Sequence, residues 1–463
     1  MKLKIPHPYT LIFFLIIFIA ILTYIVPAGE FDRYKDKDGR NLVKAGSYHT
    51  VKKNPQGVPG VLMSLIKGIE DASAVVGFVL VIGGAFGIIS ATGAIEGGLN
   101  RAVESLKGKE MLIIPVSIIL FSLGGTTFGM CEETIPLFMI FIPLCMAMGY
   151  DSMTGFLIVF MGPSAGCASS TLNPFSVGIA QAIAEIPPGT GINYRVIQFI
   201  IYTAITVIFV MCYAHRVKKN PEKSVVYEID KINRNLFLGK IGSSENMVVF
   251  TGRHALIISI FITGMIFMVW GLLVKKWYIE EVSMVFLGIA ILSGIIAGFT
   301  QDRMAESFVA GCKDFTYAAV IIGLARGVLI VAKDGKIIDT ILFSSATLLA
   351  GLPKPLFVTL MLFTQNIIAF LVPSSSGLAS LTIPVLAPLG DLLHIHRDII
   401  VTAYQYGGGI TGMISPTTGT LMAGLSIAKI PWNKWAYFIL PVLIFYWLIA
   451  VIFLIVGLSV CTV

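Results

Sequence analysis

Apolar stretches long enough to cross a membrane follow one another along most of the chain. A spanning helix needs about 20 consecutive, predominantly apolar residues. Nine stretches meet or approach that length, and we predict a membrane-spanning helix in each: 8–27, 73–95, 153–183, 195–214, 254–274, 282–300, 316–332, 398–427 and 436–458. The pattern therefore predicts an all-α, polytopic membrane protein.

Two further apolar stretches, 111–149 and 355–391, are each interrupted near the middle by small polar residues. The first turns within 124–134 and the second within 372–380. Two ordinary spans of about 20 residues would leave almost no residues for a loop in either stretch. We therefore predict two re-entrant helical hairpins, each of which enters the membrane part way and returns.

Two of the predicted spans also contain non-helical sequence near their centres. The span 153–183 is interrupted at 163–174, and the span 398–427 is interrupted at 407–420. Unwound backbone is tolerated at membrane depth only where it is buried in protein or lines a wet cavity. Its amides attract carboxylates and its carbonyls coordinate Na+. Small residues also favour close helix crossings, but two broken spans and two hairpin turns together favour ligand binding.

The two halves of the chain resemble each other in the order and spacing of short motifs. The matched pairs are 64–71 with 307–314, 82–87 with 322–327, 134–136 with 382–384, and 166–169 with 412–415. Each half reads as a span, an interfacial helix, a span, a hairpin, a broken span and a span. The unmatched span 254–274 reverses the direction of the second half, which predicts an inverted-topology repeat typical of secondary transporters. The predicted divisions are a first repeat (1–214), a linker with the extra span (215–281) and a second repeat (282–463).

Composition supports the membrane class and excludes others. Of 463 residues, 56% are hydrophobic and only 13% are charged, and the mean hydropathy is +0.87. A soluble domain carries roughly 25% charged residues, so a soluble enzyme, a disordered chain and a nucleic-acid binder are excluded. The net charge of +7 then describes the loops.

Basic residues in the loops predict the orientation. The segment 215–253 holds eight Lys or Arg residues, and basic loops favour the cytoplasmic side. With two re-entrant hairpins, this places the N-terminus in the cytoplasm and the protein in the inner (cytoplasmic) membrane of the cell. The segment 28–61 carries seven basic residues on the predicted outer side, which is evidence against this orientation.

Three ionisable residues fall deep inside the predicted membrane region. Glu132 and Glu133 occupy the first hairpin turn, and Arg326 lies in the middle of a span. A charge at that depth costs at least about 2.5–3.5 kcal/mol, so each is a candidate functional residue. We expect Arg326 to face a substrate carboxylate and the Glu pair to meet a cation, which is a substrate amine, Na+ or H+. The alternative is a structural ion pair between Arg326 and one Glu.

Enzymatic motifs are incomplete. Residues 162–166 match the G-x-S-x-G nucleophile pattern, but the six histidines (7, 49, 215, 254, 394 and 396) lie in loops or at span ends. The chain has no phosphate-binding P-loop sequence. Six cysteines (131, 145, 167, 212, 312 and 461) form no CxxC pair, and we interpret them as small hydrophobic residues. We predict that the chain is not an enzyme and has no cofactor beyond a coupling Na+ or H+.

Four motifs resemble the YfcC group of the C4-dicarboxylate anaerobic carrier family, within the ion transporter superfamily: Gly-Met-Cys-Glu-Glu-Thr-Ile-Pro (129–136), Gly-Leu-Ala-Arg-Gly (323–327), Val-Pro-Ser-Ser-Ser-Gly (372–377) and Ile-Ser-Pro-Thr-Thr-Gly (414–419). The resemblance implies a homodimer with scaffold helices, opposed hairpins and an elevator-like transport domain. It implies substrate binding at Thr126, Thr127, Ser169, Ser170, Thr171, Asn173, Ser374, Ser375, Ser376, Ser415, Thr417 and Thr418. Na+ is expected near Gly129, Asn173, Gly377 and Thr418.

The motifs depart from the family pattern in a way that bears on the substrate. Dicarboxylate carriers of the superfamily present Ser-Asn-Thr motifs, and this chain has none. The Glu132–Glu133 pair would repel a dianion unless it were protonated or bound to a cation. Some YfcC-like proteins are associated with arginine–ornithine exchange, and a Glu pair with one Arg suits a basic amino acid. We expect transport of a small carboxylate-bearing solute, with basic amino acid exchange or uptake ahead of Na+- or H+-coupled C4-dicarboxylate transport.

Overall fold

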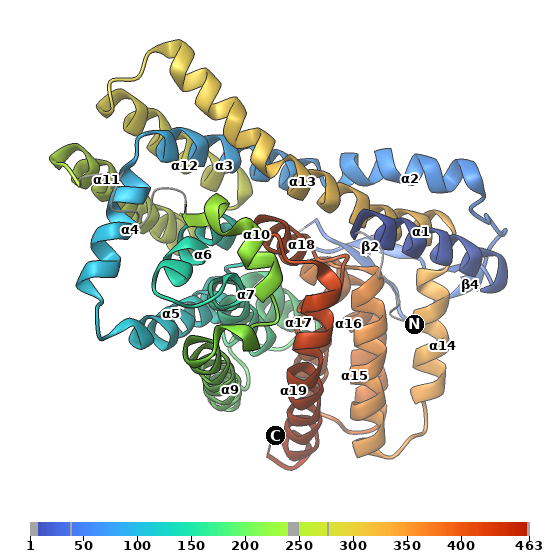
Figure 1. Cartoon of the computed structure of the whole chain (residues 1–463). Helices are drawn as coiled ribbons and strands as arrows, with labels where there is room; N and C mark the ends of the chain where they lie inside the picture. Colours follow the sequence, from blue (N-terminus) through green and yellow to red (C-terminus); the bar gives the residue numbers. More distant parts are fainter. Residues whose placement is uncertain (1–7, 38, 239–249, 276, 461–463) are drawn as a thin grey trace.

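Helices make up nearly all of the protein, as the hydrophobic pattern predicts. The computed structural model of the chain describes residues 8–37, 39–238, 250–275 and 277–460 (Figure 1). His7, Lys240 and Cys461 lie outside these ranges. In the described part, eight helices are long and apolar enough to cross a membrane: Ser73–Ala91, Glu110–Phe128, Ile192–Lys219, Gly252–Lys275, Ile279–Ile296, Gln301–Asp334, Lys354–Leu371 and Trp432–Val460. The all-α, multi-pass prediction is therefore confirmed.

One group of helices packs around the long helix α13. Its members are α1 (Pro8–Ile25), α2 (Val58–Asp71), α3 (Ser73–Ala91), α4 (Ala94–Ser105), α11 (Gly252–Trp270), α12 (Ile279–Ile296) and α13 (Gln301–Asp334). Helix α13 contacts α1, α2 and α3, while α12 packs between α3 and α11. In Figure 1, α13 crosses the upper part of the molecule and extends from α3 to α2. We call this set the α13 group.

The continuity of α13 corrects one sequence expectation. The repeat predicts an interfacial helix and a separate span in each half of the chain. The first half follows this pattern, because α2 ends at Asp71 and α3 begins at Ser73. The second half does not, because Gln301–Asp334 is a single helix of 34 residues. This stretch contains no proline, so nothing in its backbone interrupts the hydrogen-bond ladder.

Glycines allow α3 and α13 to cross with their backbones in contact. A Cβ atom on Gly311 would lie 2.1 Å from the carbonyl oxygen of Gly83. A Cβ on Gly87 would lie 2.3 Å from the carbonyl oxygen of Ser307. Any larger side chain at these positions would separate the two helices. The crossing therefore fixes the centre of the α13 group.

A second group consists of two bundles with matching internal packing. The first bundle holds α5 (Ile113–Phe128), α6 (Phe138–Ala147), α7 (Ser152–Ala168) and α9 (Ile192–Lys219), and the second holds α15 (Lys354–Leu371), α16 (Ser375–Leu392), α17 (Arg397–Gly412) and α19 (Trp432–Val460). In the first bundle, α5 and α6 pack on α7, and α9 packs on α5 and α7. In the second, α15 and α16 pack on α17, and α19 packs on α15 and α17. We call these eight helices the paired bundles.

Shorter elements lie between the helices of the two groups. They are η1 (Glu110–Leu112), η2 (Glu132–Leu137), η3 (Pro174–Gly178), α8 (Ile179–Ile183), η4 (Pro221–Lys223), α10 (Tyr227–Leu238), η5 (Gly271–Lys275), α14 (Ile338–Leu349) and α18 (Gly419–Ile427). Helices α7 and α17 contact each other, and α18 packs on α13. The last contact joins the paired bundles to the α13 group.

Two short antiparallel sheets of two strands each and the helix α14 were not expected from the sequence. Strand β1 (Gly29–Glu30) pairs with β4 (His49–Thr50), and β2 (Arg33–Lys35) pairs with β3 (Asn41–Val43). Arg33 donates to Asp339 in α14 at 2.8 Å, and Asp339 also accepts the backbone N–H of Phe31. Strands of two or three residues are too short to show an alternating pattern.

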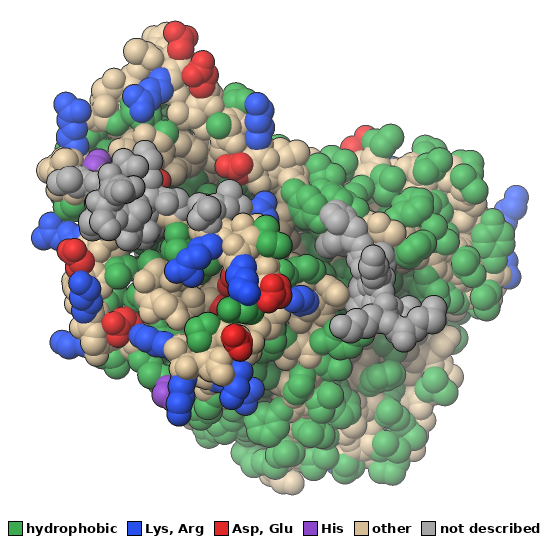
Figure 2. Space-filling model, viewed as in Figure 1, with side chains coloured by type: hydrophobic (Ala, Val, Ile, Leu, Met, Phe, Trp, Pro, Cys, Tyr) green, Lys and Arg blue, Asp and Glu red, His purple; other side chains and the backbone are tan. Residues whose placement is uncertain are grey.

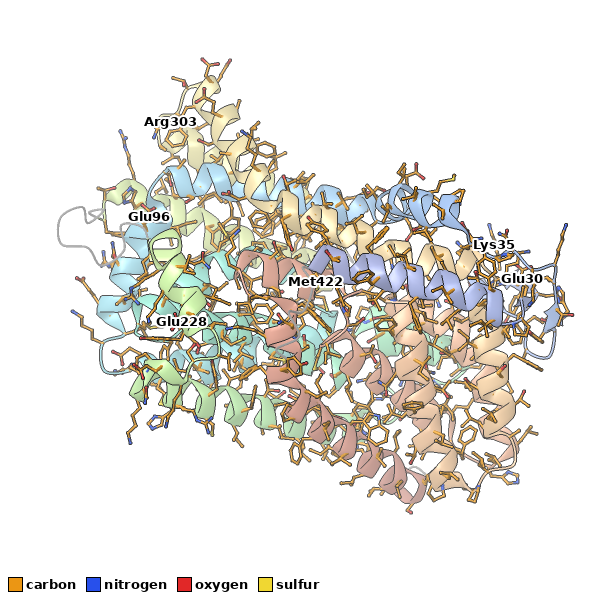
Figure 3. The ribbon with its side chains drawn as sticks, turned by 45° about the vertical axis from the view of Figure 1, so that its right-hand side comes forward. Glu30, Lys35, Glu96, Glu228, Arg303 and Met422 are labelled. Carbon is orange, nitrogen blue, oxygen red and sulfur yellow. The ribbon has the colours of Figure 1, made fainter. Side chains whose placement is uncertain are left out.

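Charged side chains are concentrated at the periphery. Figure 2 shows them over α4, α9 and α10, whereas hydrophobic side chains cover the surface around α15 and α19. In Figure 3, Met422 on α18 lies near the centre, with Glu30 and Lys35 at one end and Glu228 at the other. Segments distant in sequence form ion pairs: Lys218 with Glu110, Lys336 with Glu30, and Arg397 with Glu185. The molecule thus has two charged ends and an apolar middle.

Candidate solute-binding cavity

A cavity of about 290 Å³ lies where the broken helices and the hairpin turns meet. Its walls come from η2, the segment after α7, the N-termini of α16 and α18, and the middle of α17. The α13 group contributes Val75 and Arg326, and Tyr278 at the start of α12 completes the wall. The α13 group and the paired bundles therefore enclose the cavity together.

The first wall is the turn between α5 and η2. Helix α5 ends at Phe128, and Gly129 follows in the left-handed conformation with φ of +77°. A side chain there would be strained and would collide with Asn173, because a Cβ would lie 2.7 Å from its Oδ1. The backbone N–H of Cys131 donates to Glu133 Oε2 at 2.9 Å. These contacts place the Glu132–Glu133 pair at the cavity in the first turn of η2.

The second wall is the interruption after α7. This helix ends at Ala168, and regular structure resumes at Pro174 with Asn173 as its N-cap. Asn173 Oδ1 accepts the backbone N–H of Phe175 at 2.9 Å, and its Nδ2 donates to the Gly125 carbonyl at 3.4 Å. The same residue thus caps the resumed helix and holds the interruption against α5.

The third wall is formed by two helix N-termini. Helix α16 begins at Ser375, and Ser374 Oγ caps it by accepting the backbone N–H of Gly377 at 3.3 Å. Helix α18 begins at Gly419 after the extended residue Thr418. Helix N-termini carry partial positive charge and unpaired backbone N–H groups. This side of the cavity therefore favours an anionic group, in contrast to the side that carries Glu132 and Glu133.

Arg326 has a partner that neither sequence hypothesis named. Its Nε lies 2.9 Å from Asp71 Oδ2, at the end of α2. The predicted partners of Arg326 are a substrate carboxylate or one Glu of the pair. The charged residues that line the cavity are Glu132, Glu133 and Arg326. Because Asp71 balances Arg326, the cavity wall is acidic on balance.

The structure places about half of the expected site residues on the cavity. Those that line it are Gly129, Glu132, Glu133, Asn173, Arg326, Ser374, Ser375, Ser376 and Thr418. Those outside its lining are Thr126, Thr127, Ser169, Ser170, Thr171, Gly377, Ser415 and Thr417. The second set nevertheless lies in or beside the same turns and interruptions.

Many hydroxyls of the second set bond within the protein. Ser169 Oγ donates to the Ala165 carbonyl at 2.6 Å, and Thr127 Oγ1 donates to the Leu123 carbonyl at 2.6 Å. Ser415 and Thr417 bond each other at 2.6 Å, and Thr417 also donates to the Phe370 carbonyl. Such bonds satisfy helix ends at a break in the chain. In this conformation these hydroxyls stabilise the interruptions.

A family model places the chain among known proteins. The model described as "C4-dicarboxylate anaerobic carrier", DcuC, matches residues 5–459. The chain belongs to the DcuC family. The resemblance stated from four motifs is thus confirmed over nearly the whole length, and this DcuC-family protein is a multi-pass membrane transporter of the DcuC/YfcC type.

Two relatives share more than 30% of their residues with this DcuC-family carrier. The Escherichia coli K12 protein named "Putative basic amino acid antiporter YfcC" is 35% identical over 468 residues, which cover 93% of this chain and 92% of the relative. A Haemophilus influenzae protein named "Uncharacterized protein" is 31% identical over 495 residues, covering 98% and 97%.

Two solved transporter structures are also similar over most of their length. MtrF of Neisseria gonorrhoeae, described among "a Class of Antimetabolite Efflux Pumps", aligns with a TM-score of 0.41 and 18% identity, covering 98% of this chain and 95% of MtrF. The Alcanivorax borkumensis YdaH transporter aligns with a TM-score of 0.41 and 15% identity, covering 98% of both chains.

The carrier also has a buried charged network that the sequence analysis missed. Arg195 on α9 is fully buried and donates to Asp398 Oδ1 on α17 at 2.6 Å. It also donates to Gln405 Oε1 at 2.5 Å. Gln405 lines the cavity and donates to the carbonyls of Ala168 and Ser170 at the interruption after α7. Arg195 and Asp398 stand at the first positions of the predicted spans 195–214 and 398–427, where a charged residue does not stand out in the sequence.

Aromatic and sulfur-bearing residues complete the lining. The rings of Phe175 and Tyr278 are in tilted contact with 5.4 Å between their centroids, and Cys131 and Cys167 also line the cavity. Tyr278 lies in a loop between two spans, where no local pattern marks it as a site residue. Cys131 lies in the motif 129–136 beside Glu132, so the sequence could have indicated it as a site residue.

Proposed function

We propose that this DcuC-family carrier is a secondary active transporter of basic amino acids, by exchange or uptake. The observation that carries the proposal is the acidic wall of the cavity. Glu132 and Glu133 line it, while the cation of the lining, Arg326, is held by Asp71. A guanidinium or ammonium side chain bound beside the two carboxylates would balance their charge and form charge-assisted hydrogen bonds.

The carboxylate of the same solute is assigned to the opposite wall. The N-termini of α16 and α18 present unpaired N–H groups, and Ser376 and Thr418 add hydroxyls beside them. This assignment replaces Arg326 as the expected carboxylate partner. The cavity volume of about 290 Å³ is at the small end of the range for small-molecule sites, which suits an amino acid.

The proposed transport mode is an elevator-like movement within a homodimer. The matched contacts within the paired bundles support an inverted repeat, with the first repeat at 1–214, the linker at 215–281 and the second repeat at 282–463. The hairpins are 111–149 and 355–391. The α13 group would be the scaffold, and the paired bundles would carry the solute. The ion pairs Lys218–Glu110 and Lys336–Glu30 support the predicted alternation of spans, since each pair joins loops predicted on one side. The cytoplasmic N-terminus is proposed from the basic residues of the segment 215–253.

The alternative is Na+- or H+-coupled transport of C4-dicarboxylates. The printed family description favours this solute class. A dianion would need Arg326 to leave Asp71, and it would need the Glu pair to be protonated or bound to a cation. Na+ near Gly129, Asn173, Gly377 and Thr418 would supply such a cation.

Competition in proteoliposomes tests the proposal against the alternative. Uptake of labelled arginine would be measured against unlabelled ornithine, lysine, succinate and fumarate, with and without a Na+ gradient. We expect ornithine and lysine to compete and succinate to leave uptake unchanged. Succinate uptake without arginine uptake would reverse the assignment.

A further inference from the structure

Two cysteine thiols meet in the wall of the cavity. Cys131 lies in the turn between α5 and η2, and Cys167 is the second-last residue of α7. Their Sγ atoms are 3.4 Å apart, and both residues line the cavity. Cys167 Sγ also contacts the carbonyl oxygens of Gly125 and Met130, at 3.5 and 3.8 Å. Neither cysteine is fully buried, so both are open to reagents that enter the cavity.

The separation of the two sulfurs sets the chemistry that can join them. A disulfide bond is about 2.05 Å long, so a relative shift of roughly 1.4 Å would close one. In the described part of the chain, no group of three or more His, Cys, Asp or Glu residues is arranged to hold a metal ion. The pair is therefore a dithiol rather than part of a larger metal-binding cluster.

We infer that Cys131 and Cys167 form a modification site at which a low-molecular-weight disulfide produces an intramolecular disulfide and arrests transport. One cysteine thiolate attacks the small disulfide, forms a mixed disulfide and releases one small thiol. The thiolate of the other cysteine then displaces the second small thiol. The two protein thiols are oxidised, the small disulfide is reduced to two thiols, and the two protons pass to those products.

The arrest follows from the position of Cys131. Its backbone N–H orients Glu133 through the bond of 2.9 Å to Oε2. A bond to Cys167 would pull this turn toward α7 and fix two segments that lie 36 residues apart. Glu133 would then leave its position in the acidic wall. A displacement of about 1 Å in a positioned group is enough to reduce function by roughly 100-fold.

The experiment uses the full-length carrier in proteoliposomes treated with oxidised glutathione. The primary measurement is the mass of the peptides that contain residues 131 and 167, which does not depend on the transported solute. We expect a linked pair lacking two hydrogens, restored by dithiothreitol. Phenylarsine oxide, which bridges two neighbouring thiols with release of water, should protect the pair from glutathione.

Uptake of labelled arginine and of labelled succinate is measured in parallel. We expect oxidation to reduce uptake of the transported solute at least about tenfold, given the displacement of Glu133. The double variant Cys131→Ser/Cys167→Ser, which can form neither a mixed nor an internal disulfide at this site, should be insensitive to oxidation. Cys212→Ser, which changes an exposed cysteine on α9, should respond like the wild type.

Each outcome decides one part of the inference. Separate glutathione adducts on Cys131 and Cys167, with no bond between them, would overturn the dithiol site. A formed bond with unchanged uptake of both solutes would overturn the arrest. Uptake of succinate in place of arginine would contradict the proposed function alone, because the mass measurement and the succinate arm would still test the cysteines.

Discussion

At the scale of single residues, the main feature of the site is the position of its charged side chains. Glu133 is 6% exposed, and its Oε2 accepts the Cys131 N–H. The sequence predicted Glu132, Glu133 and Arg326 as deep charges, because such residues are rare in apolar stretches. It could not predict the Asp71 partner of Arg326, since that contact joins α2 to α13 across 255 positions. It could also not separate the Ser and Thr residues that line the cavity from those that stabilise a chain break.

Replacing Glu133 by Gln should weaken arginine binding. The change removes one charged acceptor and keeps the size of the side chain. Hydrogen bonds to charged groups contribute about 1.5–3 kcal/mol, so we expect roughly a 10- to 100-fold rise in the arginine concentration at half-maximal uptake. Glu228→Gln, at an exposed position on α10, is the matched control. Equal affinity in both variants would remove Glu133 from the site.

Replacing Arg195 by Met should destabilise the fold. Asp398, which is 1% exposed, would lose its cationic partner, and breaking a buried pair costs about 3–5 kcal/mol. The matched control is Arg397→Met on α17, where the ion pairs with Asp391 and Glu185 are partly exposed and each contribute about 1 kcal/mol or less. Melting temperatures in detergent measure both. A double variant with Asp398→Leu should recover part of the loss.

At the scale of elements, the sequence predicted where most helices lie but not which helices pack against each other. The predicted interruptions at 163–174 and 407–420 overlap the observed breaks, because Gly, Pro and polar residues cluster there, but they begin too early. Helix α7 continues through Pro163 to Ala168, and α17 continues to Gly412. The continuity of α13 was missed, because the repeat suggested two helices and no local signal distinguishes one from two. Close crossings depend on which glycines face a neighbouring backbone, and that depends on the assembled structure.

Replacing Gly166 by Ala should lower stability although alanine favours helices. A Cβ at this position in α7 would lie 2.1 Å from the Ser122 carbonyl oxygen of α5. Such overpacking costs typically about 1–3 kcal/mol. Gly288→Ala in α12, where a Cβ meets open space, should instead gain about 0.5–1 kcal/mol. Thermal unfolding of the two variants should therefore shift in opposite directions.

The contact of α10 with the start of α7 should make stability depend on pH. Burial raises the pKa of Asp230 to about 6, although hydrogen bonds from the Ser152 N–H and hydroxyl act in the opposite direction. The folded state therefore holds this proton more tightly than the unfolded chain. Protonated Asp230 therefore adds about 3 kcal/mol at most to the free energy of unfolding. This contribution is complete below about pH 4 and is lost as the pH rises through about 6.

Comparison with Asp230→Asn isolates this effect from other carboxylates. Melting temperatures of both proteins would be measured in detergent between pH 4.5 and 7.5. We expect the wild type to lose stability relative to the variant as the pH rises. If the wild type instead gained stability relative to the variant as the pH rises, the raised pKa of Asp230 would be refuted.

At the scale of the whole molecule, two charged ends enclose an apolar middle. Glu30 and Lys35 lie at one end of Figure 3, and Glu96, Glu228 and Arg303 lie at the other. Low charge and long apolar stretches predicted this arrangement. The sequence could not predict that two distant halves of the chain enclose one cavity, because the cavity wall joins residues from Val75 to Thr420.

Impermeant thiol reagents should label the two ends from opposite sides of the membrane. Single cysteines introduced at Lys35 and Glu228, with all six native cysteines replaced by Ser, would be compared in right-side-out and inverted vesicles. We expect Lys35→Cys to be labelled from outside and Glu228→Cys from the cytoplasmic side. Labelling of both from one side would overturn the proposed topology.

The ion pair between Asp71 and Arg326 has a kinetic consequence. It leaves Glu132 and Glu133 as the unbalanced charges of an empty cavity. Moving such a charge through hydrocarbon without a bound cation costs at least about 2.5–3.5 kcal/mol, which slows the step by roughly 100-fold. A basic solute removes that barrier when it binds. The loaded carrier should therefore reorient faster than the empty one. The rate of one-for-one solute exchange should then exceed the rate of net transport.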